Sequence, residues 1–191
     1  MPLESDEINK ILKACAKHPQ KSRGLLLRAM ILVLLYTGLR IRDVVTLRRD
    51  SVRGNRLFLR TAKTGVDVFC PLPPGAVTAL GAIPAKNRWY FWNGASKPKS
   101  AVGDYQKSLA KVLKAAGVPR AHPHLFRHTA ATLLLQDGVS LQTVSTLLGH
   151  SSIKMTEKRY SHWIKARQDK FVDPFGPSRP TFPPIIVVVS H

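Results

Sequence analysis

Acidic residues are scarce in this chain of 191 residues, which has 11 Asp and Glu against 30 Lys and Arg and a formal net charge of +19 at pH 7. Because the carboxylates are so few and are spread along the chain, the sequence does not favour an active site with paired carboxylates or two metal ions. A domain this basic instead predicts a polyanionic partner, with nucleic acid as the first candidate. The charge alone does not distinguish an enzyme from a passive binder.

Cysteine and long apolar runs are also scarce. Cys15 and Cys70 cannot build a disulfide framework, and they fit a reducing compartment. The most apolar run, 25–36, includes Arg28 and is shorter than the roughly 18 residues that a membrane helix needs. The segment 1–10 lacks the apolar centre of a signal peptide. We therefore expect a cytoplasmic protein without a membrane partner.

Several catalytic motifs are missing from the sequence. It contains no Walker A loop, no G-x-S-x-G and no C-x-x-C pair. Seven histidines invite a metal, but those at 122, 124 and 128 lack a nearby Asp, Glu or Cys that would complete a zinc set. We therefore expect no metal site and no cofactor.

The hydrophobic pattern predicts an α+β fold that is mainly α-helical with one small antiparallel β-sheet. Apolar residues recur at helical spacing in seven segments: 6–17, 25–36, 43–47, 102–116, 125–136, 141–148 and 156–164. Two segments alternate instead, 56–61 and 66–72, and the Lys-Thr-Gly at 63–65 between them predicts the turn of a β-hairpin. The aromatic segment 89–92 is either another short strand or a buried loop.

The composition changes after residue 175. Five prolines fall within 174–191, and 185–189 is an uninterrupted β-branched run. We therefore expect one domain over 1–175 and a Pro-rich, apolar tail over 176–191. The tail is either disordered or docks as a strand on a sheet edge, in the same molecule or in a neighbour.

Three short segments concentrate polar residues that a core would exclude. They are Thr-Gly-Leu-Arg at 37–40, His-Pro-His-Leu-Phe-Arg-His at 122–128, and Leu-Gly-His at 148–150, which Tyr160 follows ten residues after the histidine. If a helix begins after Pro123, His124 and Arg127 lie on one face of it. Arginines can hold a phosphate by bidentate hydrogen bonds without a metal, imidazole can transfer a proton, and tyrosine can act as a covalent nucleophile. This combination of residues suits phosphoryl transfer.

The motifs TGLRIRDVVTL, TAKTG, HPHLFRHTAATLLLQDG and LLGHSSIKMTEKRYSH occur in this order over 3–175. This compound pattern is similar to the catalytic domain of the tyrosine recombinases, the phage-integrase family. The resemblance implies a site-specific recombinase or integrase that cleaves and rejoins DNA through a 3′-phosphotyrosyl intermediate, without metal or ATP. It also implies double-stranded DNA as partner, a tetramer on paired DNA sites, a monomer away from DNA, and a place at the nucleoid of a prokaryote or in a phage or mobile element.

The resemblance implies a catalytic role for six residues that match family motifs: Arg40, Lys63, His124, Arg127, His150 and Tyr160. The two arginines would hold the scissile phosphate, and the lysine would donate a proton to the leaving 5′ oxygen. The first histidine would accept the proton of the nucleophile, and the second would donate a hydrogen bond to the phosphate. The tyrosine would form the covalent bond to DNA. We expect His128 to be a supporting residue that packs in the structure, and His122 and His162 to be supporting or exposed.

Two departures from the family pattern are visible. Phe126 stands where the family usually has Leu, which is a tolerable apolar exchange. Family members normally carry a separate helical DNA-binding domain before the catalytic one, and we expect none in this chain, since the first predicted helix begins at about residue 6.

Two other functions fit part of the same pattern. Residues 138–160 can be interpreted as a helix-turn-helix with a basic second helix, which would make the chain a DNA-binding regulator without catalysis. This interpretation leaves Arg40, Lys63 and the pair His124 and Arg127 without a role. A relaxing enzyme similar to type IB topoisomerases would use related chemistry, but the small single domain and the Leu-Gly-His segment favour a recombinase.

Overall fold

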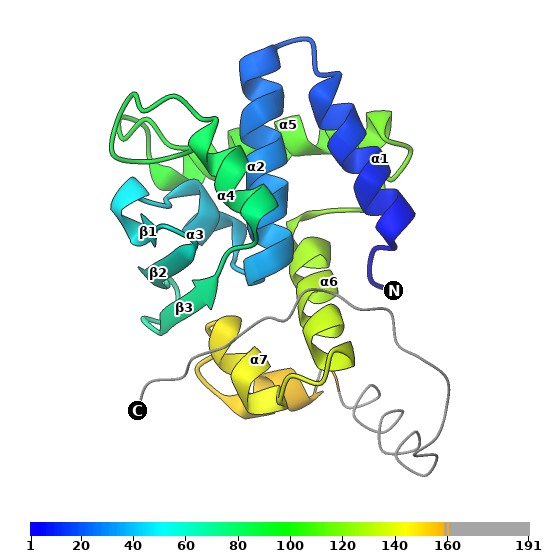
Figure 1. Cartoon of the computed structure of the whole chain (residues 1–191), viewed down its shortest axis with the longest axis vertical. Helices are drawn as coiled ribbons and strands as arrows, with labels where there is room; N and C mark the ends of the chain where they lie inside the picture. The colour runs from blue at the N-terminus through cyan, green and yellow to red at the C-terminus, as the bar shows by residue number, and fades with distance from the viewer. Residues whose placement is uncertain (159, 161–191) are drawn as a thin grey trace.

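A computed structural model describes residues 1–158 and 160 of the chain. The predicted tail and His162 lie outside these described residues. The predicted fold class is confirmed, because the described part is mainly helical with a small antiparallel sheet (Figure 1). Among the described residues, no helix is both long enough and apolar enough to cross a membrane.

The buried helix α2 (Lys21–Thr37) forms the centre of the domain. It packs against α1 (Ser5–Ala16), α4 (Pro74–Gly81), α5 (Pro98–Ala115) and α6 (Pro123–Gln136) (Figure 1). Residues 29–35 are buried on every side, which explains why this stretch has no polar face. The helix begins four residues before its predicted start. The prediction missed this first turn because it is polar and largely solvent-facing, and so lacks an apolar signal.

The short helix α3 (Ile41–Val45) and a single turn of 3₁₀ helix (Arg49–Ser51) lead from α2 into the sheet. Strands β1 (Val52–Arg53), β2 (Arg56–Arg60) and β3 (Asp67–Pro71) pair antiparallel in that order. The predicted hairpin is confirmed: Leu57 faces Cys70 on the buried side, and Phe58 faces Phe69 on the exposed side. Strand β1 has two residues, too few to show an alternating pattern in the sequence.

Two segments between the sheet and α6 differ from prediction. Helix α4 was not predicted, although Pro74 at its first position is a common helix start. Segment 89–92 forms a loop, joined to the rest by one bridge between Trp89 and Arg48 and by the Tyr105 hydroxyl, which donates to the Phe91 carbonyl at 2.8 Å. Helix α5 begins at Pro98, whereas the prediction began at 102 because the first turn of the helix is polar and gives no apolar signal.

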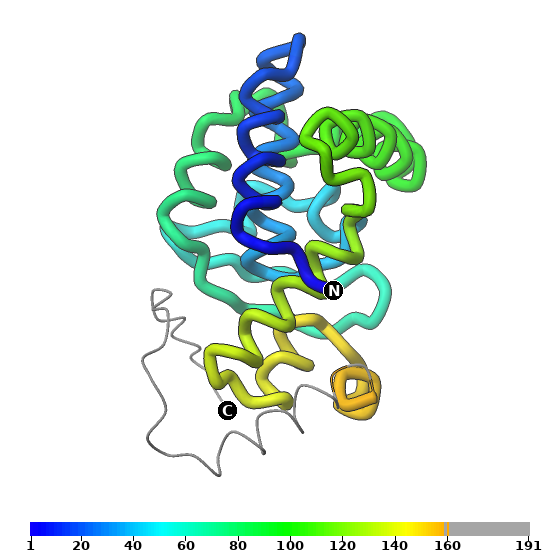
Figure 2. Tube along the Cα trace, turned by 90° about the vertical axis from the view of Figure 1, so that its right-hand side faces the viewer, coloured from blue at the N-terminus to red at the C-terminus, as the bar shows by residue number. Residues whose placement is uncertain are grey.

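The last described elements form the lower part of the molecule in Figure 1. Helix α6 leads into α7 (Leu141–Leu147), and residues 153–158 and 160 are helical. The Ser140 hydroxyl caps α7 by accepting the Thr143 amide at 3.1 Å. Figure 2 shows α5, the β2–β3 turn and segment 153–158 along one side of the molecule.

Candidate active site

The first predicted site residue, Arg40, is placed by a glycine. Helix α2 ends at Gly38, whose φ of 62° is in the left-handed region that favours glycine. A Cβ at Gly38 would lie 2.6 Å from the Cδ2 atom of Leu148, so the chain passes close to the end of α7. Two residues later Arg40 is the N-cap of α3, and its half-buried guanidinium donates from Nη1 to the Gly149 carbonyl at 3.4 Å.

The second arginine joins the same place from α6. Arg127 is 6% exposed, and its Nη1 donates to the Gly38 carbonyl at 2.6 Å. Its Nη2 lies 2.6 Å from Nε2 of His150. Because a guanidinium remains protonated and has no acceptor atom, Nε2 of His150 accepts this bond. Arg127 therefore links the end of α2 to the segment that follows α7.

The acceptor role of Nε2 fixes the tautomer of His150. A neutral imidazole with Nε2 as acceptor carries its proton on Nδ1. That atom lies 2.7 Å from the hydroxyl of Thr156, a fully buried residue of segment 153–158. The ring of His150 is thus held on one side by Arg127 and on the other by Thr156. Sequence reasoning did not find Thr156, because no spacing rule connects it to His150.

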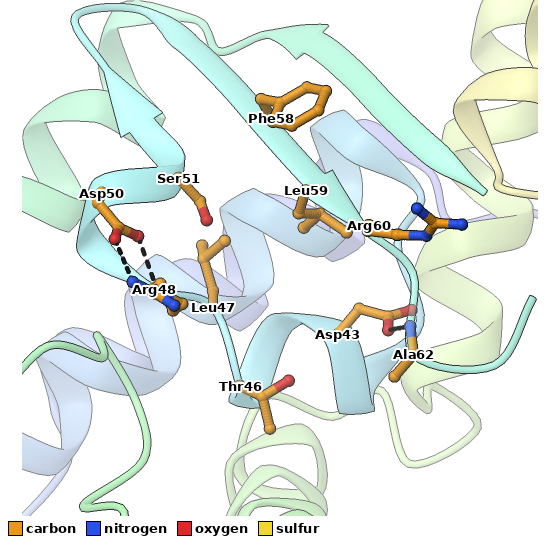
Figure 3. A pocket seen from close by; sticks show the side chains of 10 residues that line it. All are labelled: Asp43, Thr46, Leu47, Arg48, Asp50, Ser51, Phe58, Leu59, Arg60 and Ala62. Carbon is orange, nitrogen blue, oxygen red and sulfur yellow. Dashed lines mark hydrogen bonds and ion pairs between the residues drawn. The ribbon is translucent and has the colours of Figure 1, made fainter. Parts of the chain in front are cut away.

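Lys63 is exposed in the turn between β2 and β3. The turn is held on both sides of the lysine. On one side, the Asp43 carboxylate accepts the Ala62 amide at 2.8 Å (Figure 3). On the other side, the Thr64 hydroxyl donates to the Gly149 carbonyl at 2.9 Å. The turn beside Lys63 therefore contacts the same carbonyl as Arg40, and sequence reasoning did not identify Asp43 or Thr64.

His124 lies in the first turn of α6, and its side chain is exposed. It precedes Arg127 by three residues, so the two share a face of the helix as predicted. The N-terminus of α6 adds the positive end of a helix dipole here, which favours an anion. The neighbouring ring of His122 lies 6.4 Å from that of His124, centroid to centroid.

Tyr160 is buried, with 1% of its surface exposed. Its hydroxyl lies 3.2 Å from Nδ1 of His128, and the two rings are stacked, with centroids 5.4 Å apart. His128 was expected to be supporting, and the structure gives it a specific contact with the predicted nucleophile. Its position after Arg127 carried no sequence signal for this pairing across 32 residues.

Neither cysteine competes with Tyr160 as a nucleophile. Burial raises the pKa of the Cys15 thiol to about 11 and that of the Cys70 thiol to about 12. Both thiols are therefore protonated at neutral pH, and the thiolate is the reactive form. Among residues 1–158 and 160, no group of three or more His, Cys, Asp or Glu side chains could hold a metal ion.

A pocket of about 330 Å³ lies between α3 and β2, beside the turn that carries Lys63 (Figure 3). Asp43 and Ala62 form one end of it, and an ion pair between Arg48 and Asp50 forms the other. None of the six predicted site residues lines this pocket. The predicted site lies outside this pocket, where several segments meet around Gly149 and His150.

The structure thus joins two arginines and a histidine from three separate segments of a mainly helical domain, beside a lysine-bearing hairpin turn. Residues 2–167 match the model of the phage integrase family. The chain therefore belongs to the phage integrase family.

Comparisons with individual proteins agree with the family. The chain is 30% identical over 188 residues to the tyrosine recombinase XerD of Listeria monocytogenes, an alignment that covers 92% of this chain and 62% of XerD. The chain thus spans about three fifths of the length of this relative.

Solved structures show the shared fold. The catalytic domain of bacteriophage HP1 integrase superposes with a TM-score of 0.65 at 22% identity, covering 91% of this chain and 94% of that domain. The XerH recombinase bound to its difH substrate superposes with a TM-score of 0.68 at 22% identity, covering 91% of this chain and 54% of XerH.

Proposed function

We propose that residues 1–175 are the catalytic domain of a site-specific recombinase that cleaves and rejoins double-stranded DNA through a covalent bond to Tyr160. The observation that carries this proposal is the meeting of Arg40, Arg127 and the Lys63 turn at Gly149 and His150. Four segments far apart in the sequence bring their motif residues, or the immediate neighbours of those residues, to one place. A structural role alone gives no reason for this concentration of positive donors.

The roles follow from the chemistry of each group. Arg40 and Arg127 provide donors for the non-bridging oxygens of a phosphate, and the buried position of Arg127 strengthens its electrostatic effect. Lys63 provides an exposed ammonium that protonates the leaving 5′ oxygen. The imidazole of His124 accepts the proton of the tyrosine hydroxyl. His150 donates a hydrogen bond to the phosphate from Nε2, which takes up a proton once Arg127 no longer donates to it.

In the proposed reaction the Tyr160 oxygen forms a bond to phosphorus while the bond from phosphorus to the 5′ oxygen breaks. The tyrosine proton passes to His124, and a proton from Lys63 completes the 5′ hydroxyl. The 3′-phosphotyrosyl bond is itself a phosphodiester, so the reverse attack by a 5′ hydroxyl rejoins the strand. Neither step requires ATP or a metal.

The resting position of Tyr160 implies a conformational change. Its side chain is buried and its hydroxyl contacts His128, so a phosphate cannot reach that oxygen from solvent. His150 also uses its Nε2 to accept a bond from Arg127. We infer that DNA binding moves the Tyr160 hydroxyl away from His128 and lets the phosphate replace His150 as the acceptor for Arg127.

The charge of the chain supports duplex DNA as the partner. Helix α5 carries exposed lysines at 107, 111 and 114, which share one face by their spacing. Figure 2 shows this helix on the side of the molecule that also bears the β2–β3 turn. Arg40, Lys63 and Arg127 use only three of the 30 basic residues, so most of the charge is available to bind the DNA backbone. A lambda integrase tetramer bound to a Holliday junction has the same fold, with a TM-score of 0.62 at 22% identity, which supports a multimer on paired sites.

Covalent capture tests the proposal directly. The chain is incubated with a pool of nicked duplexes of randomised sequence, in which loss of the short fragment beyond the nick prevents rejoining. We expect a covalent adduct of protein and DNA, and sequencing the captured DNA identifies a cleavable site. The variant Tyr160→Phe should give no adduct, whereas Tyr36→Phe, at an exposed position on α2, should give a normal one.

The two alternative functions predict other results. A helix-turn-helix regulator would bind duplex DNA and form no adduct. A topoisomerase-like enzyme would relax supercoiled plasmid DNA and form adducts without selecting a sequence from the pool. An adduct that persists in Tyr160→Phe would overturn the proposed role of this residue.

A further inference from the structure

The Thr64 hydroxyl connects the lysine-bearing turn to the segment that carries His150. It donates to the Gly149 carbonyl at 2.9 Å, and Arg40 donates to the same oxygen at 3.4 Å. We propose that Thr64 is a positioning residue that holds the neighbouring Lys63 where its ammonium can protonate the leaving 5′ oxygen. This inference rests on the proposed function and adds a residue that the family motifs do not assign.

The hydroxyl groups of Thr64 and Thr61 each have one proton to donate. Thr64 gives its single proton to the Gly149 carbonyl, because a carbonyl can only accept. The hydroxyl of Thr61 lies 2.7 Å from that of Thr64 and 3.1 Å from the Val66 carbonyl, so its single proton is shared between these two acceptors. Thr61 in turn accepts the amide of Val66 at 3.1 Å. A network of hydrogen bonds thus connects Val66, just before β3, through both threonines to Gly149.

Close packing fixes the same contact. Gly149 has a φ of 61°, and a Cβ placed on it would lie 2.7 Å from the Cγ2 atom of Thr61. The backbone at Gly149 can therefore approach the hairpin only because this residue lacks a side chain. On the other side of Lys63, Asp43 holds the Ala62 amide at 2.8 Å.

The residues on both sides of Lys63 are thus hydrogen-bonded to other segments, Ala62 through its amide and Thr64 through its hydroxyl. The side chain of Lys63 is exposed to solvent. General acid catalysis contributes about 10²- to 10⁴-fold to a rate, and it requires the acid within hydrogen-bond reach of the atom that it protonates. Loosening the turn should therefore lower the rate of strand cleavage through the lysine, with the phosphate clamp left intact.

Replacing the leaving oxygen by sulfur separates these two effects. A thiolate leaves without a proton far more easily than an alkoxide, because the pKa of a thiol is far lower than that of an alcohol. A duplex with the site recovered by covalent capture is prepared with either oxygen or sulfur at the bridging 5′ position. Cleavage rates of the full chain are then measured on both.

The expected pattern depends on the variant. Thr64→Val, which is nearly isosteric but cannot hydrogen-bond, should cleave the oxygen substrate about tenfold more slowly and the sulfur substrate within about threefold of the wild-type rate. Thr64→Ser keeps the hydroxyl and should behave like the wild type on both. Lys63→Ala should resemble Thr64→Val with a larger defect, and Arg40→Ala should be slow on both substrates.

Other outcomes overturn the inference in distinguishable ways. An equal defect of Thr64→Val on both substrates, or no defect on either, would show that Thr64 does not act through Lys63. If Lys63→Ala lowered the cleavage rate equally on both substrates, the lysine would not be the proton donor to the leaving oxygen. A wild-type chain that cleaves neither substrate would overturn the proposed function, and the inference with it. Amide hydrogen exchange of Gly65 and Val66 gives a second readout, since Thr64→Val should accelerate it and Thr64→Ser should not.

Discussion

The guanidinium of Arg127 lies 2.6 Å from Nε2 of His150, and both groups come from segments that the sequence separates by 23 residues. The same guanidinium holds the Gly38 carbonyl at the end of α2. One side chain therefore orients the two motifs on either side of it. In the proposed function a phosphate would meet an arginine that the Gly38 carbonyl already holds, and it would have to replace only His150 as the second acceptor of that arginine.

Removing this arginine should affect both catalysis and folding. Arg127→Ala leaves the Gly38 carbonyl without its donor, which should lower the free energy of unfolding by about 1–3 kcal/mol. Loss of a charge-stabilising donor should also lower the cleavage rate by about 10²- to 10³-fold. Urea denaturation and adduct formation measure the two effects. Arg120→Ala, at an exposed position outside the site, is the control that should leave cleavage unchanged.

The tautomer of His150 is open to a separate test. Thr156→Val removes the acceptor of the Nδ1 proton without changing the size of the side chain. Nitrogen chemical shifts should report a proton on Nδ1 in the wild type and a mixture of tautomers in Thr156→Val, with Thr156→Ser close to the wild type. A proton found on Nε2 of the wild-type ring would contradict the bond from Arg127.

The two glycines with left-handed backbone near the site should not tolerate alanine. Gly38→Ala and Gly149→Ala add a Cβ that would lie 2.6 Å and 2.7 Å from neighbouring side chains, at φ values that disfavour alanine. We expect each to lower the free energy of unfolding by about 1–3 kcal/mol. Gly103→Ala in α5 has open space around the added atom and should stabilise by about 0.4–1 kcal/mol. Thermal denaturation distinguishes the two groups.

The lysines of α5 should determine how DNA binding depends on salt. Each phosphate contact that is lost reduces the slope of log K against log salt concentration by about 0.9 for duplex DNA. Replacing Lys107, Lys111 and Lys114 by Ala should therefore weaken binding to every duplex sequence and flatten this slope by as much as about 2.7. Replacing Lys10 and Lys13 on α1 together with Lys17 at its C-cap gives a control of equal charge on another helix. Equal slopes in both triple variants would contradict a specific role of α5.

Much of the fold was predictable because its signals are local. The hairpin appears as two alternating segments around Lys-Thr-Gly, and α2 appears as one apolar run. Helix starts were less accurate, since the first turns of α2 and α5 are polar and exposed. Helix α4 was missed because Pro73 and Pro74 were interpreted as the end of the hairpin region rather than as the start of a helix.

The site was predictable only as a set of motifs in order. Arg127 and His150 could be named from those motifs, but not their contact, which depends on how α6 and α7 pack. No sequence pattern indicated Asp43, Thr64 or His128 as residues that contact the site residues or their neighbours in the chain. Each of them makes a side-chain hydrogen bond across 19 to 85 residues, and periodicity carries no information about such distances.

The shared acceptor at Gly149 has a consequence for the synthesis of the protein. The bonds from Thr64 and Arg40 close loops of 85 and 109 residues, so they belong to the least local contacts of the domain. A nascent chain that has not yet emerged past residue 150 carries both arginines and the lysine turn, but not the carbonyl and imidazole that orient them. If the proposed function holds, we expect such a chain to bind DNA through its charge without cutting it, so that strand cleavage waits until translation of the domain is nearly complete.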